Sequence, residues 1–217
     1  MIVDFSRQTD LVDTEALETP VALIGCGGIG SFSALALAKM GCVHLTIFDD
    51  DRVEEQNIPN QLYRPDDVGR LKVECLADII KSFTGTGIEA RPERVQSQRL
   101  QGIVVSGVDS MAARRRIWDR SIRYKAGVAA YIDARMGAEV SRIYTVRPAD
   151  PDDVRSYERT LYSDDEALQL PCTAQAIVYN SFGIAGLVAG QVKRVAMGEA
   201  WKREIIFDQK TLTFLTA

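Results

Sequence analysis

The spacing of apolar positions predicts an α/β protein whose first strand, glycine turn and first helix follow one another directly. Residues 21–24 are a short apolar run without alternation, which is typical of a parallel strand buried on both faces. Residues 29–40 have a helical pattern, and residues 43–48 read as the next strand. The helix is expected to bury Ile29, Phe32, Leu35, Ala36 and Met40.

The same alternation of strands and helices continues to the end of the chain. Residues 72–83 form an amphipathic helix with Val73, Leu76, Ala77, Ile80 and Phe83 on one stripe. The other predicted elements are strands over 88–95 and 102–108, a helix over 110–123, strands over 127–136 and 138–147, a long buried helix over 173–197, and a hairpin of 204–208 with 211–215. This order predicts a Rossmann-like, mostly parallel sheet with helices on both faces, continued by an antiparallel section and a C-terminal β-hairpin.

The length of 217 residues suits a single domain with one full core, so residues 1–217 are predicted to fold together. Residues 1–19 are read as an N-terminal arm with a short helix around 11–17. Residues 148–171 are acidic and interrupted by proline, and they are read as one long loop.

Composition narrows the function classes. The net charge of −4 lacks the basic excess of a general nucleic-acid binder, so we expect no nucleic-acid partner. The N-terminus has no apolar signal core, and the most apolar segment, 174–189, is shorter than the roughly 20 apolar residues of a membrane span. We therefore expect a cytoplasmic protein without a membrane anchor.

The cysteines and the histidine offer no metal site. Cys26, Cys42, Cys75 and Cys172 form no C-x-x-C pair, and His44, the single histidine, reads as a packing residue of a strand. We expect no zinc and no histidine-based catalysis.

A glycine motif between the first strand and the first helix predicts a nucleotide site. Gly25, Gly27, Gly28 and Gly30 bring backbone N–H groups to a helix N-terminus, where they bind phosphate. Asp49 follows Gly30 by about 20 residues, the spacing at which a carboxylate accepts hydrogen bonds from a ribose. Two roles are open for Asp51, which are support of the ribose and capping of a helix or loop.

Five motifs in a fixed order resemble one family. They are Gly-x-Gly-Gly-Ile-Gly-Ser from Gly25, Asp49-x-Asp51-x-Val53 with Asn57 after it, Val68-Gly69-x-x-Lys72, Val105-Ser106-Gly107-Val108-Asp109, and Arg114. From about Arg7 to the final hairpin, the chain is similar to the ThiF/MoeB/HesA family of ubiquitin-activating-enzyme-like adenylyltransferases. The resemblance implies that ATP and Mg²⁺ bind over the glycine turn. It also implies that the C-terminal carboxylate of a small ubiquitin-like or sulfur-carrier protein or peptide is converted to an acyl adenylate.

The resemblance also implies roles for single residues. Gly28 lies against the phosphates, Asp49 holds the ribose, and Asn57 and Lys72 contact the nucleotide, while Ser110 is an expected nucleotide contact beside Asp109. Asp109 serves Mg²⁺ and the reacting centre. A carboxylate that attacks a polyphosphate needs positive charge, which Lys72 and the metal supply, and Asp109 suits a hard cation. Without the resemblance, Lys72 could be read as a surface lysine and Asp109 as the cap of a helix.

Three positions qualify the resemblance. Asn60 stands where the family usually has an arginine, so Arg64 or Arg70 is expected to supply the missing cation. Arg7 resembles an arm residue that reaches the ATP of the second subunit in family dimers, which predicts a homodimer. Cys172 precedes the last long helix, where relatives place a thioester or persulfide cysteine, and simple packing is its alternative.

Three other functions stay open. A nicotinamide-dependent oxidoreductase would use the same glycine motif, but the sequence offers it no obvious catalytic histidine or Tyr–Lys pair. A nucleotide-binding scaffold weakened at Asn60 is the second. A family dehydratase acting on a tRNA-bound carboxylate is the third, and the acidic balance disfavours it.

Overall fold

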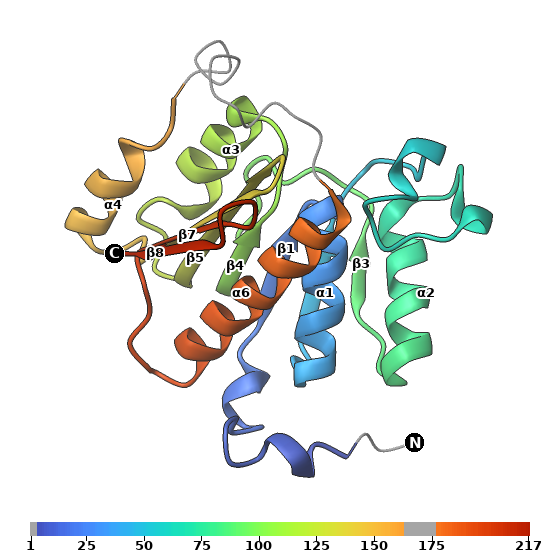
Figure 1. Ribbon diagram of the computed structural model, residues 1–217. Helices are drawn as coiled ribbons and strands as arrows, with labels where there is room; N and C mark the ends of the chain where they lie inside the picture. Colours follow the sequence, from blue (N-terminus) through green and yellow to red (C-terminus); the bar gives the residue numbers. More distant parts are fainter. Residues whose placement is uncertain (1–3, 163–176) are drawn as a thin grey trace.

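The described residues, 4–162 and 177–217 of this computed structural model, form a three-layer α/β structure around one eight-stranded sheet (Figure 1). The strand order is β3-β2-β1-β4-β5-β6-β7-β8. The strands are β1 (Val21–Ile24), β2 (Leu45–Phe48), β3 (Glu89–Arg91), β4 (Gly102–Ser106), β5 (Val128–Gly137), β6 (Val140–Val146), β7 (Glu204–Asp208) and β8 (Thr213–Thr216).

The sheet changes from parallel to antiparallel at β5. Strands β3, β2, β1, β4 and β5 pair in parallel, whereas β5–β6, β6–β7 and β7–β8 pair antiparallel. The predicted mostly parallel sheet with an antiparallel continuation and a C-terminal hairpin is therefore confirmed.

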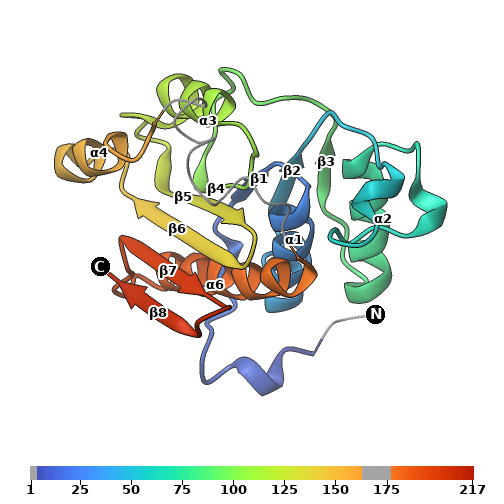
Figure 2. The same ribbon diagram turned by 45° about the horizontal axis from the view of Figure 1, so that its top comes forward.

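Helices cover both faces of this sheet (Figures 1 and 2). One face carries α1 (Gly28–Met40), α2 (Lys72–Thr84) and α6 (Val178–Ala196). The other carries α3 (Met111–Ile117), a π-helical turn η5 (Trp118–Ile122) that continues it, and α4 (Pro151–Glu158). Short 3₁₀ turns lie at η1 (Ser6–Gln8), η2 (Ala16–Glu18), η3 (Glu55–Asn57) and η4 (Pro65–Asp67).

Strand β1 has no polar side because each face of the sheet has its own core. Val21 and Leu23 pack into the cluster of α1, α2 and α6, whereas Ala22 and Ile24 pack into a second cluster that contains Trp118. All four β1 residues are buried, which explains why the strand is apolar at every position. None of the described helices is both long and apolar enough to cross a bilayer.

The topology fixes where a ligand site can form. The chain leaves β1 into α1 on one face, and it leaves the adjacent β4 into α3 on the other. In open α/β sheets, ligands bind in the crevice at the carboxyl ends of such a strand pair. The turns after Ile24 and Ser106 therefore frame the expected site.

The loop predicted over 148–171 is wrong in its first half. Residues 151–158 form α4, which is capped by Asp150, whose side chain accepts hydrogen bonds from the N–H groups of Asp152 and Asp153. Asp followed by Pro151 is a helix start, since proline fits the first turn and the carboxylate serves free N–H groups. Residues 163–171 lie outside the described residues, as do 173–176 of the helix predicted over 173–197.

Several predicted element bounds and side-chain positions are also wrong. The arm forms η1 and η2 instead of a helix over 11–17. His44 is exposed because β2 begins one residue later, and the strand predicted over 88–95 is only three residues long. Phe83 is exposed, with the Lys39 ammonium over its ring. In α1, Ala34, Leu37 and Ala38 are buried, while Leu35, Ala36 and Met40 are only half-buried.

Candidate functional site

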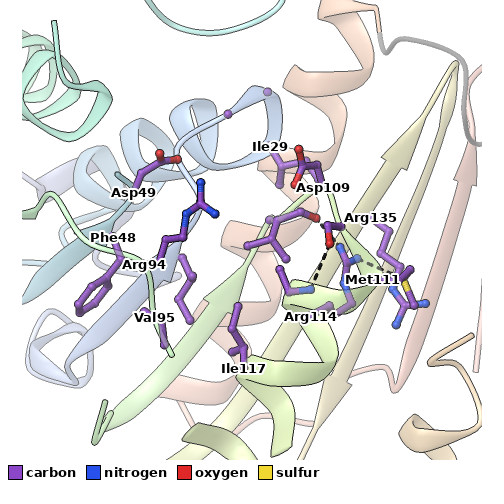
Figure 3. Close-up of a pocket in the computed structure, with 18 of the residues that line it drawn as sticks. Ile29, Phe48, Asp49, Arg94, Val95, Asp109, Met111, Arg114, Ile117 and Arg135 are labelled. Carbon is purple, nitrogen blue, oxygen red and sulfur yellow. Dashed lines mark hydrogen bonds between the residues drawn. The ribbon is translucent and has the colours of Figure 1, made fainter. Parts of the chain in front are cut away.

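A cavity of about 1020 Å³ opens at the carboxyl ends of β1 and β4 (Figure 3). The glycine turn, the acids after β2 and the start of α3 line it, so segments far apart in the sequence meet there. The sequence-derived candidates that line it are Gly25, Gly27, Gly28, Asp49, Asp51, Lys72, Asp109 and Ser110.

The four glycines of the turn differ in their geometry. Gly25 has φ +90°, and Gly30 lies so close to Gly25 that a Cβ on Gly30 would overlap the Gly25 carbonyl oxygen. A Cβ on Gly27 would have only the Gln61 side-chain nitrogen near it, at 4.0 Å. Gly25 and Gly30 therefore allow the tight turn, while Gly27 keeps the N-terminus of α1 open to an anion.

Asp49 is fixed against this turn by two backbone hydrogen bonds. One carboxylate oxygen accepts the Cys26 N–H at 2.7 Å, and the other accepts the Asp51 N–H at 2.8 Å. Burial raises the pKa of Asp49, and these two N–H groups and Lys72 oppose that rise. The carboxylate thus has one orientation beside the glycine turn.

Lys72 is a buried residue and not a surface lysine. It begins α2, its N–H donates to the Asp51 carbonyl at 3.0 Å, and its Nζ lies 3.1 Å from Asp51 Oδ2. The bridge between Arg52 and Leu71 holds the helix start in this place. Asp51 and Lys72 therefore form an ion pair on the cavity wall.

Arg94 is a cavity residue that the sequence analysis missed. Its Nε lies 2.7 Å from Asp50 Oδ1, and its Nη2 lies 3.7 Å from Asp51. A strand over 88–95 would have included Arg94. Because β3 ends at Arg91, Arg94 instead follows the strand, at the same end of the sheet as the acids.

Asp109 and Ser110 have different roles at the start of α3. The Ser110 hydroxyl caps the helix by accepting the Ala113 N–H at 3.1 Å. The Asp109 side chain is exposed at the cavity (Figure 3). The helix cap is thus Ser110, and the Asp109 carboxylate can serve a cation.

An apolar part of the cavity was also missed. Phe48, Val95 and Ile117 line it beside Asp49 (Figure 3). Each belongs to or follows a strand or helix whose apolar pattern is typical of a core, so no separate signal in the sequence marks these residues. Such a slot suits a flat heterocycle.

Several candidates lie away from the cavity lining. Gly30 packs in the turn, and Arg7 is exposed in the arm. The Asn57 side chain accepts the Glu54 N–H, and the Asn60 carbonyl accepts a hydrogen bond from the Ser181 hydroxyl. Cys172 lies outside the described residues.

The two arginines expected to compensate for Asn60 do not line the cavity either. Arg64 pairs with Asp67 at 3.1 Å, and Arg70 pairs with Asp67 at 3.2 Å and with Asp78 at 2.8 Å. Within the described residues, Arg94 is the arginine that lies beside the acids of the cavity.

The polar segment between β2 and α2 is attached to the glycine turn. The buried Tyr63 hydroxyl donates to the Cys26 carbonyl at 2.7 Å, and the Leu62 N–H donates to the Ser31 hydroxyl at 3.1 Å. These bonds hold Gln61 at the cavity next to Gly27.

The described cysteines are unsuited to covalent chemistry. Cys26, Cys42 and Cys75 are free and buried. Burial raises the pKa of all three thiols, that of Cys42 to about 12. Thiolate is the reactive form, so these three are packing residues.

This chain is similar to known proteins in sequence and in fold. A family model described as "ThiF family" matches residues 5–214. Ubiquitin-like modifier-activating enzyme 5 of Culex quinquefasciatus is 34% identical over 116 residues, 45% of this chain and 29% of that protein. The tRNA threonylcarbamoyladenosine dehydratase of Bacillus subtilis (strain 168) is 38% identical over 81 residues, 35% of this chain and 32% of that protein. The chain thus spans about a third or less of these relatives.

Solved structures share the fold at low sequence identity. MccB of E. coli, in a crystal structure with ATP, has a TM-score of 0.72 at 16% identity, with 94% of this chain and 65% of that chain covered. PaaA has a TM-score of 0.72 at 21% identity, with the same coverage of this chain. This similarity concerns the fold alone.

Proposed function

The chain belongs to the ThiF family, and on that premise we propose that it is an ATP-dependent adenylyltransferase. In this proposal it activates the C-terminal carboxylate of a small ubiquitin-like or sulfur-carrier protein or a peptide as an acyl adenylate. The supporting observation is that Gly27, Asp49, Lys72 and Asp109 line one cavity at the topological switch point. The relatives named as modifier-activating enzymes, and the MccB structures with ATP and with the peptide MccA, agree with it.

The proposed nucleotide position follows from the chemistry of the lining. The fixed Asp49 carboxylate accepts hydrogen bonds from the ribose, and the slot of Phe48, Val95 and Ile117 holds the base. The phosphates lie over Gly27 and Gly28, where N–H groups at the helix N-terminus stabilise negative charge.

The residues of the chain then assist one displacement. A carboxylate oxygen bonds to the α-phosphorus, the bond from that phosphorus to the bridging oxygen breaks, and pyrophosphate leaves. Lys72 and the α1 N–H groups reduce the repulsion between the two anions. Asp109 fits Mg²⁺, since it is an exposed carboxylate beside the phosphate position, and the ion would neutralise charge on the phosphates.

Replacing Asp109 by alanine tests this function. ATP–pyrophosphate exchange that depends on the carboxyl partner is expected to fall by about 100-fold or more, because charge stabilisation at the reacting centre is lost. Partners are obtained by mass spectrometry of proteins that co-purify with the variant.

The matched control is Asp119→Ala, which removes an exposed aspartate from the turn that continues α3, away from the cavity lining. It should retain full exchange, and both variants should unfold at the wild-type urea concentration. Undiminished exchange in Asp109→Ala, or tight NADH binding by a protein without exchange, contradicts the proposal. ATP binding without turnover of any partner would favour the scaffold alternative.

A tRNA-bound carboxylate is a second candidate substrate, supported by the similarity to the Bacillus subtilis dehydratase. It places the same activation chemistry at the same cavity. Exchange stimulated by tRNA and not by protein partners would select it. The net charge of −4 favours the protein or peptide substrate.

A homodimer is also part of the proposal. Tyr179 and Phe182 on α6, together with Phe214 and Leu215 on the edge strand β8, expose large apolar side chains. A second copy would cover such a surface. Sedimentation equilibrium is expected to give about twice the chain mass, which Phe182→Asp should reduce to one chain mass, while a wild-type monomer at micromolar concentration contradicts the proposal.

A further inference from the structure

Two arginines face each other across β5 and β6 at the end of the cavity opposite Asp49. Arg135 and Arg142 are direct partners in the antiparallel register, so their side chains leave the same face of the sheet, and both line the cavity. Arg116 from α3 also lines it. We call Arg116, Arg135 and Arg142 the arginine face.

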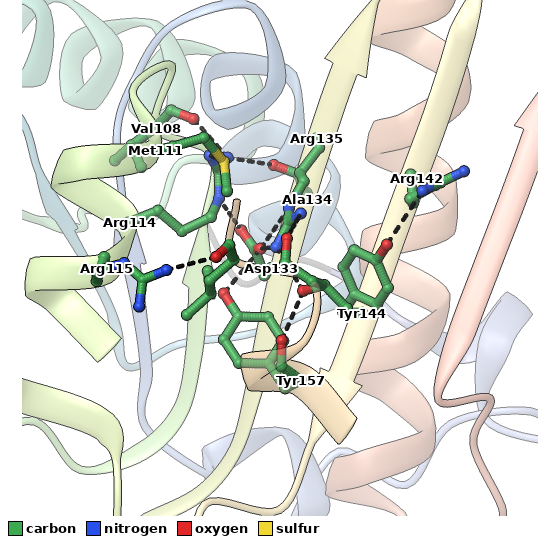
Figure 4. A network of polar contacts seen from close by, with 12 residues as sticks. Val108, Met111, Arg114, Arg115, Asp133, Ala134, Arg135, Arg142, Tyr144 and Tyr157 are labelled. Atoms are coloured by element: carbon green, nitrogen blue, oxygen red, sulfur yellow. Dashed lines mark hydrogen bonds and ion pairs between the residues drawn. The ribbon is translucent and has the colours of Figure 1, made fainter. Parts of the chain in front are cut away.

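Like charges directly opposite each other in a sheet are destabilising. Within residues 4–162 and 177–217, the neighbouring acids only partly offset this charge. Asp133 is shared between Arg114 at 2.6 Å and Arg135 at 2.8 Å, so that buried group carries one net positive charge (Figure 4). Glu204 lies 3.7 Å from Arg142 and is the acid that pairs with it in the described part of the chain. An anion in the cavity would relieve the remaining repulsion.

Arg135 is held in one geometry. Its guanidinium donates to the Thr160 carbonyl at 2.8 Å and to the Thr160 hydroxyl at 3.0 Å, and it lies 4.6 Å from the centre of the Tyr144 ring. Burial lowers the pKa of Arg135, but Asp133 outweighs it and raises the pKa overall. Asp133 and Thr160 thus occupy most of its donors, and Arg135 contributes fixed positive charge to the cavity wall.

The nucleotide contacts proposed above do not include the arginine face. The acids of the cavity, Asp49, Asp50, Asp51 and Glu93, gather with Lys72 and Arg94 near the proposed ribose and phosphates. That leaves the arginines for the other reactant, the acyl substrate.

Resting on the proposed function, we propose that the arginine face binds a second carboxylate of the acyl substrate, an Asp or Glu side chain in the tail that precedes the terminal carboxylate. Arg142 is the accessible member of the pair and makes the contact, while the mostly buried Arg135 adds positive charge opposite it. The substrate class is thus a protein or peptide with an acidic C-terminal tail.

The test measures binding, so it does not depend on turnover. Two fluorescein-labelled decapeptides with free C-terminal carboxylates differ only in three positions near the end, which are Glu in one and Gln in the other. Fluorescence anisotropy with the full chain, a non-hydrolysable ATP analogue and Mg²⁺ at low salt is expected to show at least about tenfold tighter binding of the Glu peptide.

Arg142→Gln should reduce that preference to less than about threefold, and Arg142→Lys should keep part of it. Arg142 is half-exposed, so both variants should fold, which unfolding midpoints verify. Arg155→Gln removes an exposed arginine of α4 outside the cavity and should change nothing.

Equal affinity for the two peptides overturns the proposal. So does an Arg142→Gln variant that binds the ATP analogue more weakly by the same factor, because the face would then serve the nucleotide. Binding of a 5′-phosphorylated oligoribonucleotide that needs Arg142, without peptide binding, assigns the face to nucleic acid. A Glu preference without any pyrophosphate exchange keeps the carboxylate site and rejects the proposed activity, and exchange without the preference does the reverse.

Discussion

Replacing Asp133 by alanine is expected to lower the free energy of unfolding by about 3–5 kcal/mol. The carboxylate is fully buried, pairs with Arg114 and Arg135, and accepts the Tyr157 hydroxyl hydrogen bond at 2.9 Å (Figure 4). Its removal leaves two guanidiniums close together with no buried counter-charge. Urea unfolding followed by circular dichroism measures the loss.

The effect of Asp133 should depend on pH. Burial alone would raise the pKa of Asp133, but Arg114 and Arg135 outweigh it and lower the pKa below the usual value of about 3.9. The stabilisation is therefore complete above about pH 4 and is lost as the pH falls through the lowered pKa. The difference between wild type and variant should shrink below pH 4.

Asp78→Asn is the control, because Asp78 forms an exposed ion pair with Arg70. Such pairs contribute about 0–1 kcal/mol. If Asp133→Ala unfolds no more easily than Asp78→Asn at pH 7, the buried network is not a stabilising feature.

The fold was predictable because its signals are local. The apolar run of β1, the glycine turn and the apolar pattern of α1 are contiguous, and the motif order identified the family, which the family model confirms. Sites in α/β sheets form past the carboxyl ends of the strands, and Asp49 and Asp109 each follow such an end. Both residues line the cavity.

Other parts of the site depend on pairings that no local pattern reveals. Arg114 of α3 was recognised only as a motif residue, and nothing local in the sequence shows that it is buried and pairs with Asp133 of β5. The opposition of Arg135 and Arg142 depends on the register of β5 and β6, which a one-residue shift would abolish. Arg94 was missed because the strand was predicted to run to residue 95, which placed Arg94 inside it. The strand β3 ends at Arg91, so Arg94 lies in the loop that follows.

The two glycines at the ends of the Gly27–Gly30 segment should respond to alanine in opposite ways. Gly30→Ala is expected to lower the free energy of unfolding by about 3 kcal/mol or more, because its Cβ would overlap the Gly25 carbonyl oxygen and contact Leu23 at 3.2 Å. Backbone at a tight turn cannot move aside without breaking the Gly25 hydrogen bond to Phe48.

Gly27→Ala should leave the free energy of unfolding within about 1 kcal/mol of wild type, because the added Cβ would have only the Gln61 side-chain nitrogen near it, at 4.0 Å. The same methyl group would occupy the position of a phosphate oxygen, so ATP should bind at least about tenfold more weakly, as calorimetry would measure. Each variant is the control for the other. Unimpaired ATP binding by Gly27→Ala would remove the phosphates from the N-terminus of α1, and with them the proposed direction of attack on the α-phosphorus.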